Sequence, residues 1–189
     1  MKLFQLFFVF FIVIGLSSCQ TTTDNGFYSN DKYTSRYKHP QYEYVKTAHS
    51  YHDWNEVKNR SEIRDLTGVD PVVTEWCAAF VNAVLKQNNT LGSESVNDYP
   101  LTARSFMFWG KGVSEPRIGD IVIFPRGDAG WQGHVGFYVE TRLINDIDYY
   151  VILGGNQEDK VSYELYPAYK AISVRRSVPV LSLRPSQSE

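Results

Sequence analysis

The apolar positions in the first half of the folded region repeat with the spacing of helices. Between residues 53 and 66 they favour a helical segment, with apolar side chains at Trp54, Val57, Ile63 and Leu66. A second helix is predicted over residues 77–85 from four apolar residues at helical spacing, Phe80, Val81, Val84 and Leu85. A third, shorter helix is predicted over residues 102–109, and Gly110 marks its end.

The second half of the chain carries short apolar runs separated by turn residues, which is the pattern of β-strands. Five strands are predicted, over residues 120–124, 133–140, 148–153, 161–165 and 171–175. Helices followed by strands indicate an α+β domain in which the helices pack on one face of an antiparallel sheet. We assign this domain to residues 53–180 and a C-terminal tail to residues 181–189.

The N-terminal segment has the features of an export signal. Met1-Lys2 precedes an apolar run that is short for a membrane span, which needs about 20 apolar residues. The run ends in Leu16-Ser17-Ser18-Cys19, which resembles the lipobox of bacterial lipoproteins. The resemblance implies a signal peptide over residues 1–18 and acylation of Cys19, which anchors the chain to a membrane. Gln20, in place of the aspartate associated with inner-membrane retention, favours the outer membrane, facing the periplasm. The polar residues 19–52 are expected to form the lipid anchor and a tether.

Composition and charge exclude several classes of function. With 189 residues, 43% of them hydrophobic, and a net charge of −2, the chain has room for one packed domain and no basic excess for nucleic acid. One cysteine and one histidine in the predicted sheet do not supply zinc ligands, and Gly154-Gly155 lacks the lysine and helix of a phosphate loop. We therefore expect no metal, no cofactor and no nucleic-acid partner. Nothing in the sequence identifies a regulatory protein.

Cys77 is the first candidate for chemistry. If Cys19 carries lipid, Cys77 is the remaining free thiol among two cysteines of an exported chain. It stands at the start of a predicted helix, where unpaired N–H groups lower the pKa of a thiol and can bind an oxyanion. Glu75, two residues earlier, disfavours the thiolate and is expected to cap the helix or contact substrate. The alternative is a buried, inert cysteine.

His134 is the only histidine in the predicted sheet. Strand alternation places His134, Gly136 and Tyr138 on one face, and the glycine leaves space beside the imidazole. The next strand runs into Asn156, and antiparallel pairing brings this amide near His134, where it can orient the ring. The alternatives are a core histidine held by hydrogen bonds and a turn asparagine after two glycines.

Four segments, in this order, resemble the CHAP and NlpC/P60 group of peptidoglycan hydrolases: Trp76-Cys77-Ala78-Ala79-Phe80-Val81-Asn82, Gly119-Asp120-Ile121-Val122-Ile123-Phe124, Gly130-Trp131-Gln132-Gly133-His134-Val135-Gly136-Phe137-Tyr138 and Leu153-Gly154-Gly155-Asn156-Gln157. The resemblance spans roughly residues 53–177. It implies a papain-like fold and cleavage of amide bonds in cell-wall peptide, with Cys77 as nucleophile, His134 as base and Asn156 as the third polar residue. The Asp-Cys-Ser-Gly pattern of NlpC/P60 proteins is absent, so the bond specificity of that subfamily is not carried over.

The leading hypothesis is a thiol amidohydrolase that acts on peptidoglycan, either as a stem-peptide endopeptidase or as an N-acetylmuramoyl-L-alanine amidase. The expected substrate-binding residues are Glu75, Trp76, Trp131 and Gln132. For Trp76, Trp109 and Trp131 a place in the core is the alternative. Two other functions stay open. One is a catalytically silent lipoprotein that binds or assembles the wall. The other is a transglutaminase-like acyl transferase that uses the same three residues.

Overall fold

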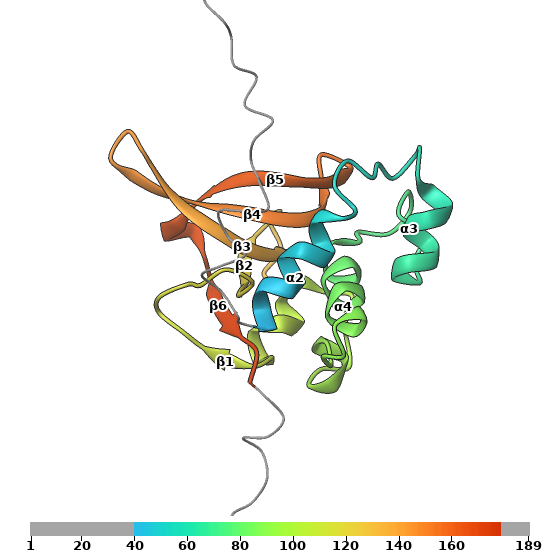
Figure 1. The fold of residues 1–189 in the computed structure, drawn as a ribbon, viewed down its shortest axis with the longest axis horizontal. Helices are drawn as coiled ribbons and strands as arrows, with labels where there is room; N and C mark the ends of the chain where they lie inside the picture. Colours follow the sequence, from blue (N-terminus) through green and yellow to red (C-terminus); the bar gives the residue numbers. More distant parts are fainter. Residues whose placement is uncertain (1–39, 179–189) are drawn as a thin grey trace, which may run out of the picture. The chain divides into compact units, whose positions relative to one another are not determined.

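The computed structural model describes residues 40–178. Its helices are α2 (Pro40–His49), α3 (Arg60–Thr67) and α4 (Cys77–Gln87), with 3₁₀ turns η1 (Ser93–Ser95), η2 (Ala103–Phe108) and η3 (Ala168–Lys170). Its strands are β1 (Lys111–Gly112), β2 (Ile121–Pro125), β3 (Gly133–Ile144), β4 (Ile147–Gln157), β5 (Lys160–Pro167) and β6 (Ser173–Arg176). They form one sheet in the order β1-β6-β2-β3-β4-β5, with every pair antiparallel (Figure 1). The predicted α+β class is confirmed.

Residues 40–52 belong to the folded domain, which corrects the expectation that the tether extends to residue 52. Four residues of α2 at helical spacing are buried: Gln41, Tyr44, Val45 and Ala48. The Tyr44 ring lies 6.1 Å from the ring of Phe137 in β3. Two of the four buried side chains carry polar groups, which hides the helical period in the sequence. The predictions for the signal peptide, Cys19 and the C-terminal tail fall on residues 1–39 and 179–189, outside the described residues.

The predicted helices and strands differ from the observed ones mainly at their ends. The helix expected from residue 53 begins at Arg60, because Asn55 Oδ1 accepts hydrogen bonds from the N–H groups of Val57 and Lys58 and forms a turn there. The helix expected over residues 102–109 is the 3₁₀ turn η2. Strand β1 was not predicted, since it has only two residues. Among the helices within residues 40–178, none has the length and apolar character to cross a membrane.

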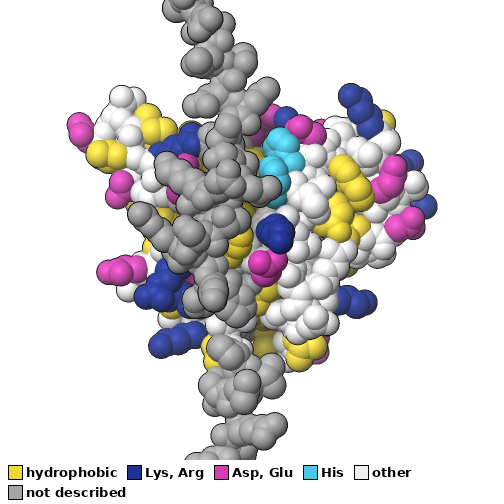
Figure 2. All heavy atoms as spheres, in the orientation of Figure 1, with side chains coloured by type: hydrophobic (Ala, Val, Ile, Leu, Met, Phe, Trp, Pro, Cys, Tyr) yellow, Lys and Arg dark blue, Asp and Glu magenta, His cyan; other side chains and the backbone are white. Residues whose placement is uncertain are grey.

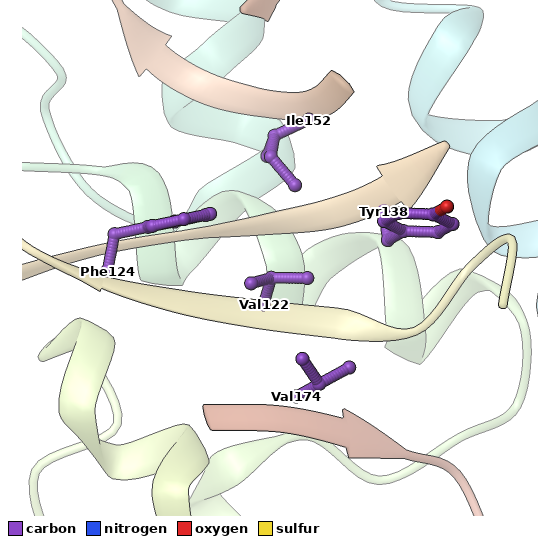
Figure 3. Close-up of a cluster of buried hydrophobic side chains, with 5 residues drawn as sticks. All are labelled: Val122, Phe124, Tyr138, Ile152 and Val174. Atoms are coloured by element: carbon purple, nitrogen blue, oxygen red, sulfur yellow. The ribbon is translucent and has the colours of Figure 1, made fainter. Parts of the chain in front are cut away.

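The two faces of the sheet are covered differently. Helix α4 packs directly on β4, because a Cβ atom on Gly155 would lie only 2.5 Å from the Trp76 ring and 2.8 Å from Phe80. Only glycine allows this approach of helix and strand. The opposite face carries a cluster of five buried side chains, shown in Figure 3: Val122, Phe124, Tyr138, Ile152 and Val174. His134 lies on this second face, because it is directly paired with Phe124 across β2 and β3.

Candidate active site

Cys77 is the first residue of α4 and is 3% exposed. Its Sγ accepts hydrogen bonds from the backbone N–H groups of Ala78 and Val135. Val135 directly follows His134 in β3, so the start of the helix lies against the part of the sheet that carries the histidine. Arg126 acts electrostatically on both Cys77 and His134, so the two sequence-predicted residues lie around one guanidinium.

The pKa of the Cys77 thiol is raised above its ordinary value, contrary to the expectation from its helix position. Burial is the largest cause. The Arg126 guanidinium and the two N–H groups act in the opposite direction, while Glu75 adds to the increase. Helix position favours a thiolate, but here the loss of water around the sulfur outweighs it. The thiol is therefore protonated near neutral pH in the free protein, and a base must accept its proton.

His134 is fully buried, and its two ring nitrogens have different surroundings. Nε2 lies 2.9 Å from Gln157 Oε1. Nδ1 has no hydrogen-bond partner among the described residues. Burial, followed by the charge of Arg126, lowers the pKa of His134 to about 3, while the hydrogen bond to Gln157 acts against this. The imidazole is therefore neutral near pH 7.

The orientation of the Gln157 amide determines which nitrogen of His134 carries the proton. Gln157 Nε2 donates to the backbone oxygens of Ser162, at 2.5 Å, and Ile152, at 3.3 Å. This leaves Oε1 toward His134, and an amide oxygen only accepts. The His134 proton is therefore on Nε2, and Nδ1 presents an unshared electron pair, as a general base requires.

Gln157, not Asn156, contacts His134, which corrects the assignment of the third polar residue. Gly154 pairs with Ser162, but Gln157 pairs with Lys160, so β4 contains one extra residue between these two points. Such a bulge reverses the alternation of side chains beyond it. Asn156 has φ 57° within the bulge, and its Nδ2 donates to Glu75 Oε2 at 2.6 Å.

Two further residues surround the histidine and were missed in the sequence. The Tyr166 ring of β5 is stacked on the His134 ring, with centroids 5.3 Å apart, and on Phe124. Arg126 follows β2 and hydrogen-bonds Tyr166. A signal for Arg126 was available: Phe124 is opposite His134, and the second residue after it in a strand points to the same face.

The four predicted substrate-binding residues have different surroundings. Trp76 is fully buried and its Nε1 donates to Glu56 Oε2, so it is a core residue, which corrects its assignment to the substrate-binding surface. Trp131 is 67% exposed. Gln132 stabilises its own loop, because its Oε1 accepts from the Ala129 N–H at 2.9 Å. The Glu75 side chain is 80% exposed and lies 3.7 Å from Arg126 Nη1. For Trp109, a place in the cleft and a place in the core were the alternatives. It is 5% exposed and its Nε1 donates to the Leu91 carbonyl, so it is a core residue.

The other described histidines form a separate cluster. The rings of His49 and His52 lie 5.8 Å apart, and both contact the ring of Tyr163. In Figure 2, histidine side chains lie together on the side of the molecule in view, with positively and negatively charged side chains nearby. Within residues 40–178, no group of three or more His, Cys, Asp and Glu side chains is arranged to hold a metal ion.

Acid is expected to destabilise the fold through His134. Because its pKa is about 3 in the folded protein and about 6.5 otherwise, the unfolded chain binds a proton between these values that the folded chain does not. The free energy of unfolding should therefore fall by about 1.4 kcal/mol for each pH unit as the pH is lowered through this range. Urea titrations at about pH 7 and about pH 4.5 measure the change.

The control for this experiment is His134→Gln, whose amide can still donate to the side chain of Gln157 but does not titrate. Its stability should depend less on pH than that of the wild type, by the contribution assigned to His134. Equal pH dependence in the two proteins would contradict the assignment.

Comparison with known proteins gave one match. Residues 69–156 match the family model described as the CHAP domain. This range contains Cys77, His134 and Asn156 and ends directly before Gln157. Neither the curated proteins nor the solved structures gave a match to the chain. The helices and six-stranded antiparallel sheet agree with the papain-like fold that the sequence resemblance implied.

Proposed function

Because the chain carries a CHAP domain, we propose that it cleaves amide bonds of cell-wall peptide through Cys77 and His134. A CHAP domain indicates peptidoglycan hydrolase activity in general and peptidoglycan as the substrate. The proposal adds the nucleophile, the base and the kind of bond. Gln157 is proposed as the third residue of the site, which orients His134.

One observation carries the proposal. His134 Nε2 lies 2.9 Å from Gln157 Oε1, and the other ring nitrogen, Nδ1, is buried without a hydrogen-bond partner in the described range. A buried nitrogen without a hydrogen bond destabilises the fold, and a catalytic role is one reason for which native proteins retain such a group. Removing the proton from a neutral thiol is such a role, and Cys77 Sγ lies against Val135, the next residue of the strand.

The reaction then proceeds in two halves. Cys77 Sγ attacks the carbonyl carbon of the scissile amide while its proton moves to His134 Nδ1. The backbone N–H of Cys77, at the first position of α4, has no acceptor within the helix and is available to the oxyanion. The carbon–nitrogen bond breaks, His134 returns the proton to the leaving amine, and a thioester remains. Water, deprotonated by His134, attacks the thioester, and the carboxylate product leaves as the thiol re-forms.

Product analysis tests the proposal and identifies the bond. Purified sacculi are incubated with the protein, and the released products are identified by mass spectrometry. A stem-peptide endopeptidase releases products cut between amino acids. An N-acetylmuramoyl-L-alanine amidase leaves a free amine on alanine and a free carboxylate on the muramoyl group. If no product is released, a wall-binding protein without activity is favoured, and if an added amine is incorporated into the product, an acyl transferase is favoured.

The location of the protein is a second part of the proposal. Leu16-Ser17-Ser18-Cys19 supports lipidation of Cys19, and Gln20 supports anchoring to the outer membrane, facing the periplasm. Such an anchor would keep the hydrolase beside its substrate. Labelling of cells with radioactive palmitate is expected to label the wild type but not Cys19→Ser. Equal labelling of both proteins would refute lipidation at this cysteine.

A further inference from the structure

Arg126 connects four parts of the chain around the candidate site. Its Nη1 and Nη2 atoms each lie 3.3 Å from the backbone oxygen of Asn156 in the β4 bulge. Nη1 also lies 3.7 Å from Glu75 Oε2, just before α4. Its side chain hydrogen-bonds Tyr166 of β5, whose ring is stacked on that of His134. The guanidinium therefore joins the end of β2 to β4, β5 and the start of α4.

The contact with Asn156 stabilises the bulge that places Gln157. A bulge leaves its extra residue unpaired in the strand ladder. Asn156 lies in this bulge, with φ 57°. Its carbonyl accepts hydrogen bonds from the Arg126 guanidinium in place of a strand partner. The planar guanidinium offers two donors in a fixed arrangement, which a lysine cannot reproduce. Because Gln157 follows Asn156 directly, this contact influences the position of the Gln157 amide.

The charges facing Cys77 have opposite signs. Arg126 contributes a positive charge from the loop after β2, and Glu75 a negative charge from the segment before α4. Tyr166 of β5 also acts on Cys77 and is uncharged near neutral pH, because burial raises its pKa. His134 of β3, with its pKa of about 3, is uncharged there as well. Glu75 alone would oppose the anionic sulfur, and the adjacent guanidinium compensates for it.

We propose that Arg126 is a positioning residue of this active site, which holds the Gln157-bearing bulge and offsets Glu75 so that the sulfur of Cys77 can become anionic. The inference rests on the proposed function for its importance in catalysis. Its two parts, geometry and charge, are separable. Arg126→Lys keeps the charge without the paired donors, while Arg126→Gln removes the charge.

The charge part is tested by alkylation of Cys77, which needs no peptidoglycan. The full chain is treated with iodoacetamide over a range of pH, and modification of the Cys77 peptide is quantified by mass spectrometry. The midpoint of the rate is expected to move up by about one pH unit in Arg126→Gln and down by a smaller amount in Glu75→Gln. Arg126→Lys should stay near the wild type. Shifts of both neutralised variants in the same direction, or no shift in Arg126→Gln, would overturn the charge part.

The geometric part is tested by hydrolysis of sacculi at the optimum pH of each variant. Arg126→Lys is expected to lose about tenfold or more in kcat, although its alkylation midpoint is preserved. Unchanged kcat would overturn this part. Because the Glu75 side chain is 80% exposed, Glu75→Gln is expected to fold and keeps the charge test informative if Arg126→Gln is unstable. If the alkylation midpoints shift as expected while the wild type does not hydrolyse sacculi, the proposed function fails and the charge part stands.

Discussion

Cys77→Ala is expected to lower the release of products from purified sacculi by about 10⁴-fold or more, a loss typical of removing a nucleophile. The variant keeps the helix and the sheet around it, since alanine is a good helix former and is smaller than cysteine. What it lacks is the sulfur that is proposed to form the thioester. The rate of product release, followed by mass spectrometry over time, measures the effect.

The second cysteine provides the matched control. Cys19→Ser removes the other cysteine of the chain and is expected to leave the activity of the purified protein on sacculi unchanged. Cys77→Ser is expected to be nearly as inactive as Cys77→Ala, because a hydroxyl has a far higher pKa than a thiol and His134 is a weak base. Release of the same products at the same rate by wild type and Cys77→Ala would rule out Cys77 as the nucleophile and favour a wall-binding function or another catalytic group.

Trapping the intermediate links this loss to the mechanism. A thioester on Cys77 adds the mass of the acyl part of the substrate to the protein. Rapid acid quenching during turnover followed by mass spectrometry is expected to detect this addition on the Cys77 peptide of the wild type. His134→Gln should accumulate less of it, because the thiol of Cys77 is protonated near pH 7 and loses its general base.

The sequence predicted those parts of the site that depend on local pattern. Cys77 follows the turn region before a run of helical spacing, and the helix starts at this residue. His134 falls on the face of its strand that alternation predicts, shared with Tyr138. Both predictions required only the period of a single helix or strand, which is why they agree with the structure.

The parts that depend on packing could not be predicted in this way. The helix position of Cys77 suggested a lowered pKa, but burial, which comes from the whole fold, reverses the direction. Helix α2 was missed because its packed face includes Gln41 and Tyr44, whose polar groups resemble those of a tether. The sequence predicted Asn156, and not its neighbour, as the residue that contacts His134, because the apolar pattern does not reveal the bulge in β4. Two glycines and an asparagine occupy the position of this bulge.

The second large effect is expected from a substitution of Gln157, the residue that the bulge places beside His134. Gln157→Leu is expected to reduce kcat on sacculi by about 10²- to 10⁴-fold, a range set by residues that orient a catalytic histidine in other enzymes. Leucine has a similar size but neither accepts from His134 Nε2 nor donates to the Ser162 and Ile152 carbonyls, at 2.5 and 3.3 Å in the wild type. These unpaired groups should also lower the stability by about 1–3 kcal/mol, so activity is measured well below the melting temperature of the variant.

Asn156→Gly is the matched control, one residue away. Glycine adopts φ near 57° without strain, so the bulge and the carbonyl that binds Arg126 are retained, while the contact to Glu75 is lost. We expect less than about tenfold loss of kcat, since a hydrogen bond between exposed groups contributes little. A larger loss in Asn156→Gly than in Gln157→Leu would restore asparagine as the third residue of the site.

The ring nitrogens of His134 provide a direct measurement of what Gln157 does. In ¹⁵N NMR spectra, the wild type is expected to show a single neutral tautomer with the proton on Nε2, because Gln157 Oε1 accepts from that nitrogen. In Gln157→Leu the two tautomers should exchange, and the fraction with an unprotonated Nδ1 should fall. Because only that fraction can accept the thiol proton of Cys77, a decrease in kcat without a change of tautomer would show that Gln157 acts on stability and not on the orientation of the base.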